Sequence, residues 1–554
     1  MKILVIIPAR GQSKGIPKKN ICLMNGKPLI AYSIRNAHLL ERYYDVDIVV
    51  DTEDEEIADV AGQYLAEVIY RPMSLANDDI TLDPVIYHAL VECEKTKSVT
   101  YDIVITMQPT SPTLKGITLL EAVNYFIKND IDTLISAVNA PHLSWTEKDG
   151  KKCPVYVERK NRQYLPPDYV ETGAFLITRR ENVNNKSRIG KNVDIFEVRD
   201  DESIDIDTGM DWQLCELILK KKKIILRADG EECLGMGHIY RCLSIAYHLI
   251  GHDILFVTRG DRDLGVRKIQ DSHFNYKTIM SDEDFFEIVQ EEKPDIIVND
   301  ILDTNKYYIQ KLKQMVKRVV NFEDKGEGSE YADCVINALY KDEHKKNHFY
   351  GFKYFFLRDE FLTARRKRFS DVVENVVVLF GGTDPCNLTA KVYDILQIIS
   401  RLHPEIEFHI ITGFGYPYKR ELKNIEQAKI YVHNDVKCVS KYLENADMAI
   451  TSQGRTIYEL ASMGIPSIVM AQNARELEHT FASVGNGFIN LGMGENLSQE
   501  SILSTIEWLI KTPNVRREMH EKLLEKDFVS GQKRIIKLVL GEEDEEDNSR
   551  TIES

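Results

Sequence analysis

The sequence predicts an α/β protein, and three patterns support this fold class. Short apolar runs typical of buried strands alternate with amphipathic segments of helical period, as in residues 3–7 and 57–65. Loops that contain glycine follow several of the expected strands. The alternation starts afresh near residue 220 and again near residue 372, which indicates several α/β domains in succession. A chain of 554 residues has room for about three or four domains.

The first 222 residues form the first expected domain. We expect strands at residues 3–7, 46–50, 103–107 and 133–138, with helical patterns between them and at 212–219. Four lysines, Lys220 to Lys223, end this region, and a new strand begins at Ile224. Lysines at a helix end also favour the helix dipole, so the boundary depends on the fresh strand–loop–helix pattern that follows them.

Two further α/β lobes of similar size are expected, over residues 223–371 and 372–540. The first has strands at 224–226, 254–257 and 296–298, and the second has strands at 376–380, 408–412 and 448–451. Two such lobes in succession suggest a two-lobed transferase fold with a cleft between the lobes. Residues 541–554, which include six consecutive acidic residues at 542–547, are expected to form a disordered tail.

Composition narrows the function classes. The net charge of -16 argues against non-specific nucleic-acid binding but leaves room for a local cluster of cations that holds phosphate. Nine cysteines without a C-x-x-C pair favour reduced thiols and a cytoplasmic location. No apolar run approaches the ~20 residues of a membrane span, so we expect none.

A basic, glycine-containing loop follows the first strand at residues 8–20. Its glycines allow a ligand close to the backbone, and Arg10, Lys14 and Lys19 supply cations suited to a triphosphate. The alternative is a solvated basic loop. The loop resembles the signature of the CMP-sialic acid synthetase family of cytidylyltransferases. Five more segments resemble that family's motifs in order: 26–31, 51–57 with 71–72, 108–112, 162–174 and 204–208.

This resemblance implies a mixed sheet with helices on both faces, as in nucleotide-diphospho-sugar transferases. It implies transfer of CMP from CTP to a nonulosonic acid, release of pyrophosphate, and a homodimer formed through this domain. The implied nucleotide contacts are Arg10, Ser13, Lys14, Lys19 and Asn20, with Arg10 and Lys19 on the triphosphate. The implied contacts to the sugar acid are Gln108 and Arg162.

Asp205 and Asp207 are the expected metal ligands. In a strand, alternate side chains share a face, so the two carboxylates would hold Mg²⁺ together, an ion that prefers oxygen ligands. Nucleotidyl transfer needs such a cation to offset the developing charge, and Asp207 is the expected catalytic carboxylate. The alternative is that the pair caps a helix beginning near Asp211. The family usually has Asn where this chain has Thr172, so the identity of the sugar acid stays open.

A second glycine-containing loop follows the strand at 224–226 and ends in Gly237 and His238. A histidine at a helix start has its pKa lowered by the helix dipole, and a neutral imidazole can serve as a general base. The alternative is a histidine that only caps the helix. The segment resembles the UDP-sugar hydrolase of pseudaminic acid biosynthesis, which has a two-lobed GT-B type fold. Further matches are 321–324, 381–384, 452–460, 464–466 and 472–473.

This second resemblance implies that His238 activates water against a UDP-linked diacetamido-trideoxyhexose. The implied nucleotide contacts are Gly382, Ser452, Thr456 and Glu459, with Asn473 on the sugar. The glutamate of such a helix typically binds the ribose hydroxyls, which is the role implied for Glu459. The alternative is that Glu459 is only a surface residue of the helix. The family often has Asp-His-Tyr after the third strand, where this chain has residues 299–303 without the aromatic residue or the histidine.

Three hypotheses for the C-terminal half therefore stay open: a hydrolase, a GT-B glycosyltransferase, or a module that binds a nucleotide sugar without catalysis. The leading hypothesis is a bifunctional enzyme of nonulosonic acid biosynthesis. Its first domain would use CTP, Mg²⁺ and a nonulosonic acid, and its C-terminal half would hydrolyse a UDP-sugar precursor. Pseudaminic, legionaminic and neuraminic acids are not distinguished by the sequence.

Overall fold

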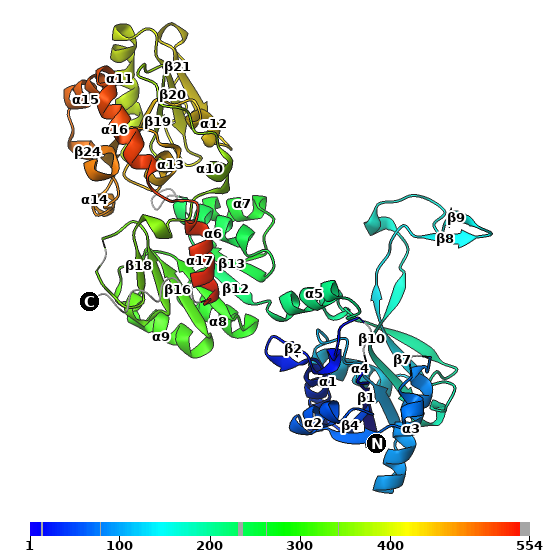
Figure 1. Cartoon of the computed structure of the whole chain (residues 1–554). Helices are drawn as coiled ribbons and strands as arrows, with labels where there is room; N and C mark the ends of the chain where they lie inside the picture. Colours follow the sequence, from blue (N-terminus) through cyan, green and yellow to red (C-terminus); the bar gives the residue numbers. More distant parts are fainter. Residues whose placement is uncertain (13–14, 78, 231–235, 262, 342, 543–554) are drawn as a thin grey trace. The chain divides into compact units, whose positions relative to one another are not determined.

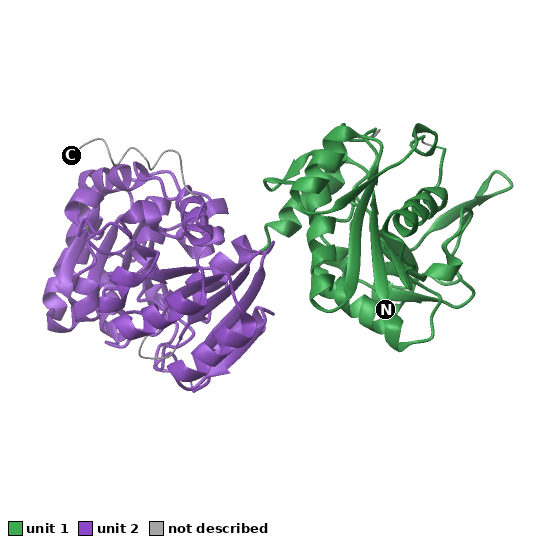
Figure 2. Ribbon diagram, turned by 90° about the horizontal axis from the view of Figure 1, so that it is seen from below, with its two compact units in different colours: residues 1–221 green, residues 222–554 purple. Residues whose placement is uncertain are grey.

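The computed structural model describes residues 1–12, 15–77, 79–230, 236–261, 263–341 and 343–542. The chain divides into two compact units, residues 1–221 and 222–554, shown in different colours in Figure 2. Each unit is an α/β structure with its own sheets (Figure 1). The α/β class predicted from the alternating pattern is therefore confirmed.

Unit 1 contains a seven-stranded mixed sheet of order β11-β7-β10-β6-β1-β4-β5. Only β10 runs antiparallel to its neighbours, β6 and β7, among the described pairs of this sheet. The strands are β1 Lys2–Pro8, β4 Asp45–Thr52, β5 Glu67–Tyr70, β6 Ile103–Thr106, β7 Thr133–Asn139, β10 Tyr169–Arg179 and β11 Val193–Glu197. All four strands expected in this region lie within this sheet.

Helices cover both faces of this sheet because strand side chains alternate between faces. Ile3, Val5 and Ile7 of β1 pack with α1, α2 and α4, whereas Leu4 and Ile6 pack with α3 on the other face. The helices are α1 Leu29–His38, α2 Glu55–Gln63, α3 Leu82–Lys97, α4 Gly116–Lys128 and α5 Gly209–Leu219. A hairpin of β8 Trp145–Lys148 and β9 Lys151–Pro154 projects from this unit (Figure 1).

Unit 2 contains two fully parallel sheets, one in each of two lobes, as expected for a GT-B type pair. The first sheet has the order β14-β13-β12-β15-β16-β17-β18 and the second the order β21-β20-β19-β22-β23-β24. First-lobe strands are β12 Lys223–Ala228, β13 Asp253–Arg259, β14 Tyr276–Ile279, β15 Ile296–Asp300, β16 Arg318–Phe322, β17 Cys334–Asn337 and β18 His348–Tyr350. Second-lobe strands are β19 Asn375–Leu379, β20 Glu407–Thr412, β21 Ile430–Asn434, β22 Met448–Ser452, β23 Ser467–Ala471 and β24 Phe488–Met493.

Helices and a shared core join the two lobes of unit 2. One buried apolar cluster contains residues of both sheets, and Phe355 stacks on Tyr458 with ring centroids 4.2 Å apart. The first-lobe helices are α6 Gly237–His248, α7 Asp263–Asp271, α8 Asp282–Glu292 and α9 Lys306–Met315, followed by α10 Asp359–Thr363. The later helices are α11 Leu388–Leu402, α12 Ser440–Leu443, α13 Thr456–Met463, α14 Ala474–Leu477, α15 Gln499–Lys511, α16 Pro513–Leu524 and α17 Gly531–Leu540.

The last helix, α17, returns to the first lobe. Arg318 at the start of β16 donates to the Leu538 carbonyl at 2.7 Å, and Lys222 donates to the Leu540 carbonyl at 2.6 Å. The range 372–540 expected for the second lobe thus includes a helix that lies on the first. This return is typical of a chain whose two lobes are stabilised as one unit.

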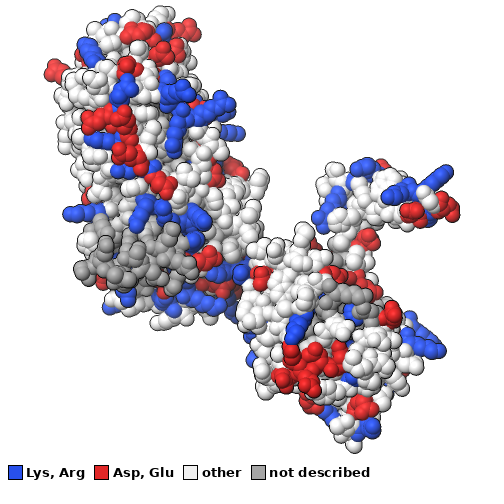
Figure 3. Space-filling model, in the orientation of Figure 1, with Lys and Arg blue, Asp and Glu red and all other residues white. Residues whose placement is uncertain are grey.

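The surface and the cysteines fit the composition. Lysine and arginine side chains are interspersed with acidic ones on the face that Figure 3 shows. None of the described helices is long and apolar enough to cross a membrane. Eight of the nine cysteines lie in the described part of the chain, and all eight are free thiols.

Candidate active sites

In unit 1, the loop after β1 packs against residues 205–207. A Cβ atom at Gly15 would lie 2.4 Å from the Asp207 carbonyl oxygen, so this close approach requires glycine. Lys19 donates from Nζ to the Ile206 carbonyl at 2.5 Å. The loop and the aspartate segment therefore form one surface at the carboxyl end of β1.

The same packing places three predicted nucleotide contacts together. Asn20 is buried and donates from Nδ2 to the Arg10 carbonyl at 3.0 Å, and Lys19 is its neighbour in the 3₁₀ turn Lys19–Ile21. Ser13 and Lys14 lie outside the described residues. The described part of the loop thus brings Arg10, Lys19 and Asn20 to one place.

Acidic residues of the segment 51–57, one of the segments that resemble family motifs, contact this loop. Glu53 accepts a hydrogen bond from the Gly11 backbone N–H at 2.7 Å, and Lys18 pairs with Glu56 at 2.6 Å. Asp54 caps α2 by accepting from the Ile57 N–H at 3.1 Å. The spacing of these acidic residues therefore serves to anchor the loop to the start of α2.

The expectation that Asp205 and Asp207 lie in a strand is wrong. Residues 203–207 belong to no strand or helix; the Ile206 N–H donates to the Thr110 carbonyl at 2.9 Å, and Ile206 is fully buried. Because Ile206 points inward, the side chains of Asp205 and Asp207 lie on the opposite side of the segment. The sequence pattern correctly predicted alternation, but this segment pairs with a loop and not with a sheet.

The capping alternative for the aspartate pair does not hold either. α5 begins at Gly209, and its cap is Thr208, whose side chain accepts from the Asp211 N–H. The Asp211 carboxylate in turn accepts from the Thr208 N–H at 2.7 Å, which completes a capping box. The carboxylates of Asp205 and Asp207 are therefore not used to cap this helix.

The electrostatics of the pair fit a divalent cation. Partial burial raises the pKa of Asp205, and the negative charge of Asp207 raises it further. Two carboxylates that repel each other are stabilised by a shared cation, and Mg²⁺ usually takes one or two carboxylates and completes its shell with phosphate and water. No group of three or more His, Cys, Asp and Glu residues that could hold a metal occurs among the described residues.

Of the two predicted contacts to the sugar acid, Gln108 lies beside the aspartate segment and Arg162 does not. Gln108 follows β6 and reaches Gly173, where a Cβ atom would lie 2.8 Å from Gln108 Nε2 and 3.6 Å from Asp205 Oδ2. Gly173 has φ +69, so its conformation also favours glycine. Arg162 lies instead in the exposed 3₁₀ turn Arg162–Tyr164, and no described contact joins it to this cluster.

Thr172 lies in the core of unit 1. It is 3% exposed, and its hydroxyl bonds to Ser136 Oγ at 2.9 Å. The neighbouring Gly173 backbone, and not the Thr172 side chain, faces Gln108 and Asp205. The departure from the family at this position therefore changes the packing behind the site.

In unit 2, the predicted base His238 is held by a carboxylate. His238 Nδ1 lies 2.5 Å from Asp300 Oδ1, at the end of β15, and the His238 side chain is 13% exposed. With Nδ1 engaged, the imidazole presents Nε2 as its second nitrogen. α6 has no side-chain cap bond, so the capping alternative for His238 does not hold.

Arg241 fixes this carboxylate from the next turn of α6. Its Nε and Nη2 atoms lie 2.6 Å and 2.5 Å from the two Asp300 oxygens, and its Nη1 lies 3.1 Å from Glu323 Oε1. Burial alone would raise the pKa of Asp300, but Arg241 and His238 hold that pKa well below its usual range. Asp300 is therefore a buried anion that orients His238.

The second lobe contributes glycine turns and the start of α13. A Cβ atom at Gly413, after β20, would lie 2.4 Å from the Gly382 carbonyl oxygen, after β19. Ser452 ends β22 and is 3% exposed, and Thr456 begins α13. Because β19 and β22 are parallel neighbours, Gly382, Ser452 and Thr456 meet at one edge of the sheet.

Glu459 and Asn473 make contacts that the sequence did not predict. Glu459 Oε1 accepts from Arg358 Nε at 2.7 Å, and Glu459 is 6% exposed, so it is not a surface residue. Asn473 caps the short helix α14, where its Oδ1 accepts from the Glu476 N–H at 2.9 Å. Both side chains are thus already engaged within unit 2.

Two aspartates, Asp300 and Asp303, lie in the segment that lacks the Asp-His-Tyr residues of the family, and the structure gives them different partners. Asp300 joins His238, whereas Asp303 forms a two-pronged pair with Arg475 of α14 at 3.1 Å. The signal that could have found the His238–Asp300 pair is strand adjacency, because β12 and β15 are parallel neighbours whose ends lie side by side.

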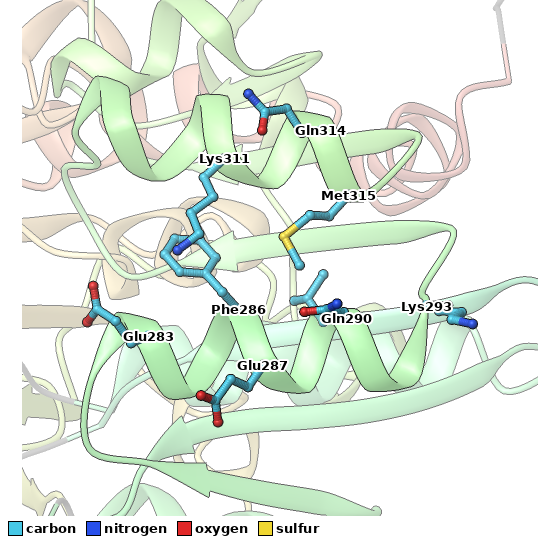
Figure 4. Close-up of a pocket in the computed structure, with 9 residues that line it drawn as sticks. Glu283, Phe286, Glu287, Gln290, Lys293, Lys311, Gln314 and Met315 are labelled. Atoms are coloured by element: carbon cyan, nitrogen blue, oxygen red, sulfur yellow. The ribbon is translucent and has the colours of Figure 1, made fainter.

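A groove of about 630 Å³ lies elsewhere in unit 2, between α8 and α9 (Figure 4). The apolar residues Phe286, Val289 and Met315 line it together with charged residues such as Glu287 and Lys311. It contains none of the predicted site residues. We therefore do not assign it to either active site.

Comparison with known proteins identifies the family to which unit 1 is similar. A model described as Cytidylyltransferase matches residues 4–228. CMP-N,N'-diacetyllegionaminic acid synthase of Campylobacter jejuni subsp. jejuni is 32% identical over 230 residues, which are 40% of this chain and 97% of that protein. The chain belongs to the cytidylyltransferase family. The resemblance predicted from six ordered motifs is therefore confirmed.

Other relatives of this cytidylyltransferase cover more of the chain. An uncharacterised protein of Methanocaldococcus jannaschii is 30% identical over 279 residues, and the chain spans 57% of that protein's length. Spore coat polysaccharide biosynthesis protein SpsG of Bacillus subtilis is 25% identical over 313 residues, 53% of this chain and 91% of that protein. An alignment of this length exceeds the 221 residues of unit 1 and so extends into unit 2. Among solved structures, MurG of Acinetobacter baumannii is similar to this chain with a TM-score of 0.43 and 12% sequence identity. The match covers 58% of this chain and 99% of the MurG chain.

Proposed function

We propose that unit 1 transfers CMP from CTP to the anomeric hydroxyl of a nonulosonic acid and releases pyrophosphate. The observation that carries this proposal is the contact between the basic loop and the aspartate segment, where Lys19 reaches the Ile206 carbonyl between Asp205 and Asp207. This contact brings the cations for a triphosphate next to the carboxylates for a metal ion. The legionaminic acid synthase of similar sequence supports the substrate class.

Each residue has a role in this reaction. Arg10 and Lys19 bind the triphosphate, Asn20 positions the nucleotide, and Ser13 and Lys14 are further proposed nucleotide contacts. Asp205 and Asp207 would hold Mg²⁺. A bound Mg²⁺ ion would offset the negative charge that develops on the phosphates. Gln108 contacts the sugar acid beside Gly173. Arg162 contacts it from the exposed turn that follows the hairpin.

The experiment for unit 1 is release of pyrophosphate from CTP in the presence of Mg²⁺ and a panel of nonulosonic acids. Pseudaminic, legionaminic and neuraminic acids are the panel, and CTP without a sugar acid is the control. Release that depends on one of these acids supports the proposal and names the substrate. Equal release with and without a sugar acid contradicts it.

We propose that unit 2 hydrolyses a UDP-linked diacetamido-trideoxyhexose. His238 Nε2 takes a proton from water, whose oxygen attacks the anomeric carbon of the sugar. The bond between that carbon and the β-phosphate oxygen breaks, and UDP leaves with the electron pair. Gly382, Ser452 and Thr456 hold the diphosphate near the start of α13, where backbone N–H groups face an anion.

Glu459 and Asn473 keep their proposed contacts through their remaining groups. Because Arg358 occupies Glu459 Oε1, the ribose contact falls to Oε2. The Asn473 side-chain amide can still donate to the sugar while Oδ1 caps α14. The His238–Asp300 pair favours a catalytic role over the binding-only alternative, because a histidine held by a carboxylate can take a proton from water or from an acceptor hydroxyl.

Incubation with the UDP-sugar alone separates these alternatives. Steady release of UDP without an acceptor supports hydrolysis. Release only on addition of an acceptor supports a glycosyltransferase, and tight binding of UDP-sugar without release supports a binding module. Nuclear magnetic resonance of the sugar product identifies the bond that was broken.

We also propose that the protein forms a homodimer through unit 1. The projecting hairpin and the turn after it expose large apolar side chains: Trp145 is 58% exposed, Val155 63% and Tyr164 69%. Exposed apolar groups that project together are typical of a protein interface. A second copy of the same hairpin is the proposed partner.

A further inference from the structure

Two charged side chains beside the His238–Asp300 pair have hydrogen-bonding atoms that no described residue uses. Glu323 Oε2 and Arg455 Nη1 are both buried atoms without a hydrogen-bond partner. Buried polar groups are almost always paired, because an unpaired one loses its bonds to water without replacement. These two atoms therefore require an explanation.

Glu323 is held rigidly from two sides. Arg241 Nη1 lies 3.1 Å from Glu323 Oε1, and Arg475 Nη2 donates to the Glu323 carbonyl at 2.7 Å. Glu323 is 3% exposed and has φ 51, a conformation uncommon outside glycine. Its carboxylate is thus fixed by the same arginine that fixes Asp300, and Oε2 is the oxygen left over.

Arg455 approaches from the second lobe. A Cβ atom at Gly237 would lie 3.3 Å from Arg455 Cδ, so the arginine stem packs at the start of α6, next to His238. Its guanidinium lies over the Phe355 ring at 4.6 Å, and Nη2 donates to the Phe356 carbonyl at 3.3 Å. Burial and the positive charge of Arg241 lower the pKa of Arg455 to about 10.

The two unused atoms have opposite requirements. Arg455 Nη1 needs an acceptor, and Glu323 Oε2, when ionised, needs a donor. No ion pair within 4.0 Å joins the two side chains among the described residues. Burial raises the pKa of Glu323, and the positive charges of Arg241 and Arg455 oppose this rise. A phosphate group would satisfy Arg455 but would repel an ionised Glu323. A secondary amide satisfies both, because its C=O and N–H point in opposite directions.

We propose that Glu323 and Arg455 form a subsite for a secondary amide on the sugar of the nucleotide sugar. The amide N–H donates to Glu323 Oε2, and its C=O accepts from Arg455 Nη1. The proposal rests on the proposed function only for the class of ligand, a nucleotide sugar bound near His238. It assigns the recognition of an acetamido substituent to two residues, one from each lobe.

The test compares two nucleotide sugars that differ in one substituent. Titration calorimetry of the full chain measures the dissociation constants of UDP-N-acetylglucosamine, which has an amide, and UDP-glucose, which has a hydroxyl there. We expect the wild type to favour the acetamido sugar. Glu323→Gln and Arg455→Met are each expected to reduce this preference about tenfold. UDP itself should bind to Glu323→Gln as it binds to the wild type.

Glu478→Gln is the matched control, because Glu478 is half exposed, follows α14 directly and pairs with Lys325. It should keep the preference, and thermal unfolding checks that each variant is folded. If Glu323→Gln does not fold, Arg455→Met alone decides. Equal binding of the two sugars by the wild type, or an unchanged preference in the folded variants, overturns the subsite. Preserved preference for the acetamido sugar without UDP release would overturn the proposed hydrolysis while supporting the subsite.

Discussion

His238 and Asp300 form a histidine–carboxylate pair, with Nδ1 and Oδ1 2.5 Å apart, although 61 residues separate them in the sequence. The pair exists because α6 starts after β12 and Asp300 ends the neighbouring parallel strand β15. A carboxylate at Nδ1 fixes the tautomer in which Nε2 accepts a proton.

We predict that Asp300→Asn lowers the rate of UDP release by about 10²–10⁴-fold, the range of a positioned general base. The asparagine side chain would no longer stabilise the protonated imidazole. UDP release from the UDP-linked diacetamido-trideoxyhexose is the measurement, with UDP affinity measured in parallel. Asp303→Asn is the matched control, because Asp303 pairs with Arg475 and not with His238, and it should change the rate less than tenfold. Similar losses in both variants would contradict the orienting role.

We predict that Asp207→Ala slows pyrophosphate release by unit 1. The activation free energy should rise by about 3–5 kcal/mol. The variant would leave Asp205 as the single carboxylate for Mg²⁺. The measurement is CTP-dependent pyrophosphate release over a range of Mg²⁺ concentrations. Asp200→Ala, an exposed aspartate on the preceding 3₁₀ turn, serves as the control. A rate near wild type at saturating Mg²⁺ would show that Asp207 does not hold the metal.

Sequence patterns were sufficient for the fold class and for many element positions. Buried runs such as 224–226 and 448–451 predict strands because both faces of a parallel strand are covered. Residues 204–207 look equally strand-like, but Ile206 is buried against a loop at Thr110, and this depends on tertiary contacts. Single-sequence patterns carry no record of such contacts.

The site shows the same limit. His238 stands out because glycines precede it, whereas Arg241 looks like an ordinary helix residue until its two bonds to Asp300 are seen. Arg358 and Glu459 are a hundred residues apart, and no local spacing indicates that they pair. Glycine positions and motif order are local signals, while charge pairing across a sheet edge is not.

We predict that Trp145→Ser in the projecting hairpin shifts the protein from dimer to monomer. Trp145 is 58% exposed and packs against Tyr156 with ring centroids 6.1 Å apart, so the change removes apolar area from the hairpin surface. Light scattering coupled to size-exclusion chromatography measures the mass. Leu217→Ser on α5, at a site 67% exposed, removes a similar group elsewhere. If both variants stay dimeric, the interface lies outside the hairpin.

The last prediction concerns pH and His479, which lies after α14. His479 is 9% exposed, its Nδ1 lies 2.7 Å from the Gln453 carbonyl, and burial lowers the pKa of His479 to about 4. The folded state therefore binds fewer protons than the unfolded state between pH 6.5 and 4. Stability of unit 2 should rise with pH across this window and be lost as pH falls through it.

Between pH 7 and pH 5 the size of this effect has an upper limit of about 2 kcal/mol, since a shift of one pKa unit corresponds to about 1.4 kcal/mol. Urea unfolding of the full chain at pH 7 and pH 5 measures it through the transition of unit 2. His479→Gln keeps a donor for Gln453 but cannot be protonated, so its stability should depend less steeply on pH than that of the wild type. His273→Asn, at an exposed turn with φ 58, should retain the wild-type slope. An equal slope in the wild type and His479→Gln would mean that His479 does not cause the pH dependence of the stability of unit 2.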